Sequence, residues 1–161
     1  MKIQIQLNNE SDTNTLGKLL ADSLPTHCVV ALDGTLGAGK TRLTQAFVQA
    51  CDVPVEEVTS PTFTLWQTYH GTRTIHHLDA YRIKDEDEFD ALGVEEIFDV
   101  DAVTLIEWAG RVEACLPKEG RLSIHLEVIS EDARLATITS DSEKLAATFD
   151  AIATSALSQL G

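Results

Sequence analysis

The stretch VVALDGTLGAGKTRL, residues Val29–Leu43, decides the fold of this chain. It starts as a β-branched, apolar run, continues through three glycines, and ends in helix-forming residues. Residues Gly34–Thr41 satisfy the pattern G-x-x-x-x-G-K-[ST] at every fixed position. A buried strand, a glycine-rich turn and an amphipathic helix in this order predict a loop that binds phosphate groups.

The residues of this loop suit the chemistry of phosphate binding. Glycines let successive backbone N–H groups turn inward and form a nest for oxygen atoms. The helix that begins near Lys40 adds the partial positive charge of its N-terminus. We expect Lys40 to reach the β- and γ-phosphates of a nucleoside triphosphate, and we expect the Thr41 hydroxyl to coordinate Mg²⁺.

The rest of the chain alternates between strand-like and helix-like patterns. Strands are predicted at Lys2–Leu7, Cys28–Leu32, Phe63–Tyr69, Arg73–Leu78, Ala102–Ile106, Arg121–Ile129 and Arg134–Ser140. Helices are predicted from the N-cap candidates Ser11 and Asp12 to Pro25, after the glycine loop, as short acidic helices within 84–100, and at Ser142–Leu160. The expected fold is α/β: a single three-layer, P-loop NTPase-like domain over residues 1–161, with a mostly parallel central sheet plus antiparallel strands.

Composition and charge narrow the class of protein. The 161 residues include 12 Lys and Arg against 26 Asp and Glu, which gives a net charge of −14. A protein that binds nucleic acid alone needs a basic surface, so we expect any nucleic acid to be held by a partner. No apolar run approaches the roughly 20 residues of a membrane span, and the N-terminus lacks the apolar core of a signal peptide. Three widely spaced cysteines suit a reducing compartment, so a cytoplasmic location is expected.

Two carboxylates follow apolar strands and are candidates to act with the loop. Such loops need a carboxylate that holds Mg²⁺ through its water shell. Glu107 comes directly after Val103–Ile106, and Asp79 lies at the end of the second strand of a predicted hairpin. We expect at least one of them to be functional. One plausible division gives Glu107 to the metal and gives Asp79 the task of orienting water or sensing the γ-phosphate.

Other residues near these acids allow more than one interpretation. The hydroxyls of 59–62 could reach Mg²⁺ or the γ-phosphate as a switch segment, or the segment could be a simple turn. Trp108 could line the nucleotide or a partner surface, or belong to the core. His70, His76 and His77 have no matching Cys or His set for zinc, so we predict that they form a polar strand face.

Together, several segments resemble the TsaE (YjeE) family, the P-loop ATPase of bacterial threonylcarbamoyladenosine synthesis on tRNA. The matching segments are LGAGKT (Leu36–Thr41), SPTFTL (60–65), HLDAYR (His77–Arg82), the acidic segment through ALGVEEIF (Ala91–Phe98), LIEWAGR (Leu105–Arg111) and, near the N-terminus, TNTLGKLLA (Thr13–Ala21). The resemblance runs from about residue 10 to 137 in the family's order. A P-loop alone is common, but this combination is specific.

The resemblance implies roles for individual residues. Lys40 and the loop amides would bind ATP, Thr41 and Glu107 would hold Mg²⁺, and Asp79 would be needed for hydrolysis. Trp108 would lie by the nucleotide. The full implied set of nucleotide-binding residues is Thr13 at the base end, Leu36, Gly37, Ala38, Gly39, Lys40, Thr41, Arg42, Trp108 and Arg134.

The resemblance also implies partners. Such proteins hydrolyse ATP slowly alone and act with TsaD and TsaB, while TsaC supplies threonylcarbamoyl-adenylate. Two residues depart from the family pattern: Thr35 stands where an Asp is usual, and Arg42 stands where a second threonine is common. Neither change removes a phosphate ligand. Thr35 removes an acid on the γ-phosphate side and therefore bears on intrinsic turnover.

The loop by itself leaves other classes open. A GTPase would read guanine with an N-K-x-D loop, which the chain lacks, and the D-x-x-G at Asp90–Gly93 lies in an acidic helical segment. A small-molecule kinase would need arginines that clamp the transferred phosphate, and Arg73, Arg82 and Arg111 could contribute, but no lid insertion is evident. A nucleotide-binding module without useful turnover is a third alternative. The acidic run 85–90 is expected to be solvated, with docking of a basic partner surface as a hypothesis.

Overall fold

The computed structural model describes residues 1–58 and 65–160. The switch hypothesis for 59–62 and most of the SPTFTL segment lie outside the described residues. Within them, a single sheet runs through the molecule in the strand order β1-β7-β6-β2-β5-β4-β3. Its strands are β1 Lys2–Leu7, β2 Cys28–Gly34, β3 Trp66–His70, β4 Thr74–Asp79, β5 Val103–Glu107, β6 Arg121–Val128 and β7 Arg134–Thr139.

The centre of the sheet is parallel and its margins are antiparallel. Strand β2 pairs in parallel with β5 and β6, and β4 pairs in parallel with β5. The hairpins β3–β4 and β6–β7 and the pair β1–β7 are antiparallel. The predicted α/β fold, with a mostly parallel centre plus antiparallel strands, is confirmed.

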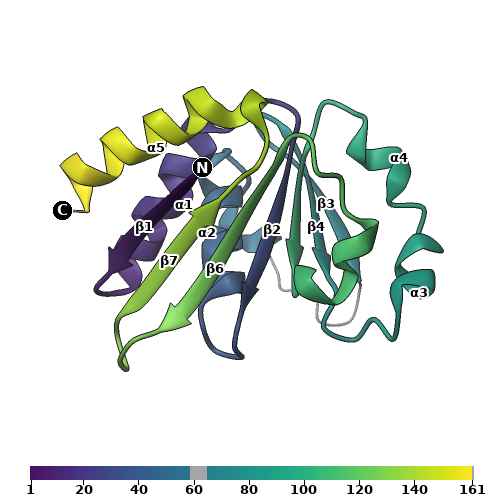
Figure 1. The fold of residues 1–161 in the computed structure, drawn as a ribbon, viewed down its shortest axis with the longest axis horizontal. Helices are drawn as coiled ribbons and strands as arrows, with labels where there is room; N and C mark the ends of the chain where they lie inside the picture. Colours follow the sequence, from purple (N-terminus) through teal and green to yellow (C-terminus); the bar gives the residue numbers. More distant parts are fainter. Residues whose placement is uncertain (59–64, 161) are drawn as a thin grey trace.

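Helices cover the two faces of the sheet unequally. Helices α1 (Glu10–Ser23), α2 (Lys40–Ala50) and α5 (Ala146–Gln159) lie on one face, where they close the larger apolar core (Figure 1). The short helices α3 (Glu86–Asp90) and α4 (Glu95–Phe98) and the 3₁₀ helix η2 (Ala109–Cys115) close a second core on the other face. Two further 3₁₀ turns are η1 (Val55–Glu57) and η3 (Glu143–Leu145). Within the described residues, no helix combines the length and the apolar character needed to cross a membrane.

Helix α1 begins earlier than its sequence predicts. Asn9 is the N-cap, and its Oδ1 accepts a hydrogen bond from the backbone N–H of Asp12 at 3.0 Å. The expectation of Ser11 or Asp12 as the cap is wrong, because Asn9 satisfies the exposed N–H group first. The helix ends at Ser23, ahead of Pro25 as expected. Gly17 lets α1 lie against α2, since a Cβ at this position would stand 2.6 Å from the Cβ of Ala46.

Strand pairing shifts three element boundaries relative to the predicted ones, at the edge of the sheet beside the glycine loop. Strand β2 extends to Gly34, β4 extends to Asp79, and β5 starts at Val103 and includes Glu107. Both acidic residues therefore belong to strands and are held in register with their neighbours, with Asp79 opposite Glu107. At the C-terminus, the predicted helix starts with the 3₁₀ turn η3 before α5. The apolar side expected of this segment is buried at Leu145, Phe149, Ile152 and Ala156 and partly buried at Leu160.

Candidate functional site

The glycine loop has the backbone conformation that its sequence predicts. Gly37 and Gly39 have positive φ angles of 79° and 103°, which residues with a Cβ rarely adopt. Gly34 has φ of 148°, and a Cβ there would lie 2.5 Å from the carbonyl oxygen of Leu126 on β6. The loop is therefore a tight turn between β2 and α2 that only glycine permits at these positions.

Lys40 is buried inside this loop. Its Nζ donates hydrogen bonds to the carbonyl oxygens of Gly34 at 2.7 Å and Thr35 at 3.0 Å, and it lies 3.9 Å from the ring centroid of Trp108. Desolvation lowers the pKa of the Lys40 ammonium, while the negative charges of Glu107, Asp33 and Asp79 oppose that shift. The cation is thus held by backbone oxygens and an aromatic face at the start of α2.

Glu107 joins the loop to the strands beside it. Its Oε1 accepts a hydrogen bond from the Thr41 hydroxyl at 2.7 Å, and its Oε2 lies 3.1 Å from Nε2 of His77. The side chains of Glu107 and His77 are each 1% exposed. A buried carboxylate is stable only when its oxygens have partners, and here both oxygens have one. The structure therefore brings Thr41 and Glu107 together, as the sequence predicts.

His77 is a residue of the site that the sequence analysis missed. The prediction of a polar strand face is wrong for His76 and His77, since both side chains are buried. Alternate residues of a strand share a face, so His77 lies on the same side of β4 as Asp79. The spacing H-x-D at the end of a strand was the sequence signal that could have placed His77 on the same face as Asp79.

Asp79 lies at the carboxyl end of β4, opposite Glu107 on β5. Its Oδ1 accepts a hydrogen bond from the backbone N–H of Tyr81 at 2.9 Å. Burial raises the pKa of the Asp79 carboxyl, and the charge of Glu107 adds to the rise, while the Tyr81 hydrogen bond, His77 and Lys40 oppose it. The group is thus a carboxylate of increased basicity at the last residue of the strand.

Trp108 forms one wall of the site. It has a left-handed backbone, with φ of 59°, and its ring lies 4.8 Å from that of Tyr81 between centroids. Asp33 stabilises this turn, because its Oδ1 accepts a hydrogen bond from the backbone N–H of Gly110 at 2.9 Å. A depression of about 200 Å³ opens here, lined by Leu36, Gly37, Gly39, Lys40, Thr41, Arg42 and Trp108.

Of the remaining predicted residues, Arg42 lines this depression. Arg42 turns toward α1, where it pairs with Glu10 at 3.1 Å and donates to Oδ1 of Asn14 at 3.1 Å. Thr13 is buried in α1. Thr35, which departs from the family pattern, is exposed at the loop.

Arg134 contacts the loop from the β6–β7 side. Its Nε and Nη2 donate to the carbonyl oxygens of Ala38 at 3.1 Å and Gly37 at 3.3 Å. Its Nη1 donates to carbonyl oxygens in the turn between β6 and β7, those of Ser130, Glu131 and Ala133. The guanidinium therefore ties the glycine loop to the hairpin.

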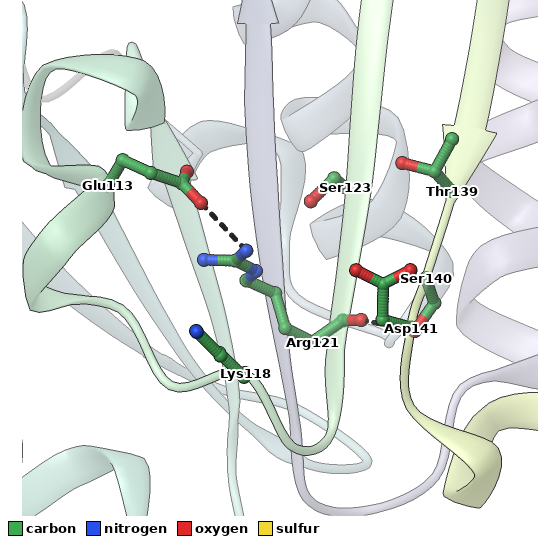
Figure 2. Close-up of a pocket in the computed structure, with 7 residues that line it drawn as sticks. All are labelled: Glu113, Lys118, Arg121, Ser123, Thr139, Ser140 and Asp141. Carbon is green, nitrogen blue, oxygen red and sulfur yellow. Dashed lines mark hydrogen bonds and ion pairs between the residues drawn. The ribbon is translucent and has the colours of Figure 1, made fainter.

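A second pocket, of about 360 Å³, lies at the opposite end of the central strands. It is lined by Glu113, Lys118, Arg121, Ser123, Thr139, Ser140 and Asp141 (Figure 2). Arg121 donates to Oε1 of Glu113 at 2.7 Å across this pocket. No residue that the sequence analysis selected lies in it. Among residues 1–58 and 65–160, no group of three or more His, Cys, Asp or Glu side chains is placed to hold a metal ion.

The model of the family "Threonylcarbamoyl adenosine biosynthesis protein TsaE" matches residues 7–136. The chain belongs to the TsaE family. It is 39% identical over 139 residues to the tRNA threonylcarbamoyladenosine biosynthesis protein TsaE of Rickettsia felis, covering 86% of this chain and 80% of the relative. The protein of the same name from Bacillus subtilis is 39% identical over 132 residues, which cover 81% of each chain.

A solved structure supports the same assignment. The crystal structure of Bacillus subtilis YdiB superposes with a TM-score of 0.80 at 29% identity and covers 96% of each chain. The likeness includes the residues beyond 140, where the sequence resembles the TsaE family only loosely. The resemblance to the TsaE family and the fold expected from it are both confirmed.

Proposed function

We propose that this chain is a Mg²⁺-dependent ATPase that serves synthesis of N6-threonylcarbamoyladenosine at position 37 of tRNA, together with TsaD and TsaB. The observation that carries the proposal is the contact between Thr41 and Glu107 beside Lys40, in a chain of the TsaE family. A triphosphate-binding loop without a buried carboxylate beside it could bind a nucleotide without hydrolysing it. Here the Thr41 hydroxyl and the Glu107 carboxylate together offer ligands for a metal ion.

The residues present fit Mg²⁺. Mg²⁺ prefers hard oxygen ligands, and it is commonly bound by one or two protein groups together with phosphate oxygens and water. Thr41 and Glu107 offer a hydroxyl and a carboxylate that already lie 2.7 Å apart. When bound, the ion would neutralise charge that develops on the phosphate oxygens. Lys40 would bind the same phosphates through its ammonium group, which now donates to loop carbonyls.

Asp79 has the environment of a residue that orients water. One of its oxygens is fixed by the Tyr81 N–H, and burial raises the pKa of its carboxyl. A carboxylate with a raised pKa accepts a proton more readily than an exposed one. We assign Asp79 the role of orienting the attacking water. Trp108 would form a wall of the nucleotide site, and Arg42 would lie at its rim.

The charge of the chain supports indirect access to tRNA. A net charge of −14 disfavours direct contact with the phosphates of a nucleic acid. Partners of the cytoplasmic modification complex would therefore hold the tRNA, and this chain would supply ATP turnover to them.

Thr13 at the base end and Arg134 behind the loop complete the proposed nucleotide site.

The decisive experiment measures ATP hydrolysis with and without the TsaD–TsaB pair. We expect slow release of inorganic phosphate from the chain alone and a clear stimulation by the pair, with no release from Lys40→Ala under either condition. The absence of stimulation would overturn the proposed partnership. Transfer of the γ-phosphate to a small molecule, in place of release as inorganic phosphate, would support the kinase alternative.

A further inference from the structure

His77 makes a buried contact with the candidate metal ligand Glu107. Its side chain is 1% exposed, and its Nε2 lies 3.1 Å from Oε2 of Glu107. Within the described residues, Nδ1 of His77 is buried without a hydrogen-bond partner. An ionised carboxylate only accepts hydrogen bonds, so Nε2 of His77 is the donor in this contact.

The two oxygens of Glu107 have separate partners. Oε2 faces His77 on β4, while Oε1 accepts from Thr41 at the start of α2. A glutamate side chain has three rotatable bonds, and a single hydrogen bond leaves its outer torsion free to turn. The contact with His77 removes that freedom and presents Oε1 to Thr41.

We propose that His77 is a positioning residue for the Mg²⁺ site, which fixes the Glu107 carboxylate so that Oε1 stays beside the Thr41 hydroxyl. The inference rests on the proposed function, because it assigns Glu107 and Thr41 to the metal. Groups that hydrogen-bond to a metal-binding side chain orient it, and their loss typically weakens metal affinity. His77 itself would touch neither the metal nor the nucleotide.

The neighbouring histidine offers a matched control. His76 is also buried, but it faces the opposite side of β4, as successive strand residues do. Its Nδ1 lies 3.2 Å from Nε1 of Trp66 and 3.0 Å from the hydroxyl of Thr68. Loss of His76 removes a buried imidazole from the same strand without touching Glu107.

The test is the Mg²⁺ dependence of nucleotide binding, measured by titration calorimetry with a non-hydrolysable ATP analogue. For His77→Leu we expect the Mg²⁺ concentration that gives half of the maximal affinity gain to rise by roughly 10- to 100-fold. Affinity in EDTA should stay within about 2-fold of the wild type, since the loop itself is intact. His77→Gln, whose amide can reach Oε2, should restore most of the Mg²⁺ response, and His76→Leu should match the wild type.

Several outcomes would overturn the inference. An unchanged Mg²⁺ response in His77→Leu would do so, and so would an equal loss of affinity with and without Mg²⁺. If His77→Leu does not fold, the test uses the two amide variants, His77→Gln and His77→Asn. The longer Gln side chain can reach Oε2 of Glu107, whereas the shorter Asn side chain cannot. Equal Mg²⁺ responses in the Gln and Asn variants then overturn the inference. A wild-type chain that binds no nucleotide at all would instead overturn the proposed function.

Discussion

The polar groups at the two ends of the central strands differ in how deeply they are buried. At the carboxyl ends of β2, β4 and β5, Lys40, His77 and Glu107 are buried and contact partners within the protein. At the amino end of β6, Arg121 pairs with a Glu113 side chain that is 58% exposed (Figure 2). The pocket at this second end is the larger of the two, at about 360 Å³ against about 200 Å³.

The larger pocket therefore does not coincide with the proposed nucleotide site. Electrostatic interactions are stronger where water is excluded, so the buried groups near the loop can hold a charged ligand firmly. An exposed ion pair contributes little, because water screens its charges. Three closely spaced positive-φ glycines, Gly34, Gly37 and Gly39, and the buried, partnered charges distinguish the end where we propose that the nucleotide binds. Substitutions at four residues test this difference.

Lys40→Ala should have the largest effect. It removes the buried ammonium group that is placed to bind phosphate oxygens, and each charge-assisted hydrogen bond contributes about 1.5–3 kcal/mol. Loss of two such hydrogen bonds from the ammonium group to phosphate oxygens should lower nucleotide affinity by at least about 100-fold. Calorimetric titration with an ATP analogue and Mg²⁺ measures this loss of affinity. If the variant binds the analogue as tightly as the wild type, the loop does not bind phosphate as proposed.

Asp79→Asn should reduce turnover with little change in binding. The amide keeps the shape of the side chain but accepts protons poorly, so release of inorganic phosphate should fall on the order of 100-fold. Nucleotide affinity should change by less than about 3-fold, since the phosphate ligands remain. Wild-type turnover in this variant would contradict the role assigned to Asp79.

The stability of Asp79→Asn gives a control for this result. Burial raises the pKa of Asp79 above its ordinary value of 3.8, so the folded state favours the protonated form. The charged form at pH 7 therefore costs stability, and that cost vanishes as the pH falls toward 3.8. The variant should melt at a higher temperature than the wild type at pH 7, and the gap should narrow as the pH falls through the raised pKa toward 3.8. A lower melting temperature at pH 7 would contradict this electrostatic account.

Arg134→Ala should have an intermediate effect. It removes the hydrogen bonds that tie Gly37 and Ala38 to the β6–β7 hairpin. A less ordered loop predicts a loss of nucleotide affinity of roughly 10-fold. Arg134→Lys, which cannot reproduce the fork of donors, should lose nearly as much. Full recovery in the lysine variant would indicate that only the positive charge matters.

Arg121→Ala should have the smallest effect. The Arg121 side chain is 16% exposed, but its partner Glu113 is 58% exposed, so water screens the pair and the free energy of unfolding should change by about 1 kcal/mol. Nucleotide affinity should change by less than about 2-fold, because the residue lies at the far end of β6. Chemical denaturation and calorimetric titration measure the two quantities. A large loss of function would show that the pocket of Figure 2 also serves the protein.

Different parts of the site were predictable from the sequence to different degrees. The glycine loop was predictable because its backbone conformation depends on consecutive residues. The neighbourhood of Glu107 and Thr41 followed from the need for a carboxylate and from the family resemblance. The burial of His77 was not predictable, because it depends on contacts across two strands. The cap of α1 was misplaced because Asn9, Ser11 and Asp12 can all cap a helix, and only packing selects among them.

By itself, the sequence determined the local elements and the class of protein. Period-two and period-3.6 patterns fix which segments form strands and helices, and the spacing of glycines and Lys40 fixes a phosphate-binding turn. These features involve residues that are close along the chain, so elementary sterics and burial specify them.

Only the tertiary structure decided which distant groups meet. The order β2-β5-β4 places Glu107 beside Thr41, 66 residues away in sequence, and places His77 against the same carboxylate. It also directs Arg134 to the carbonyl oxygens behind the loop. The physical reason is that sheet order and register depend on the summed burial of both faces, which no short segment contains.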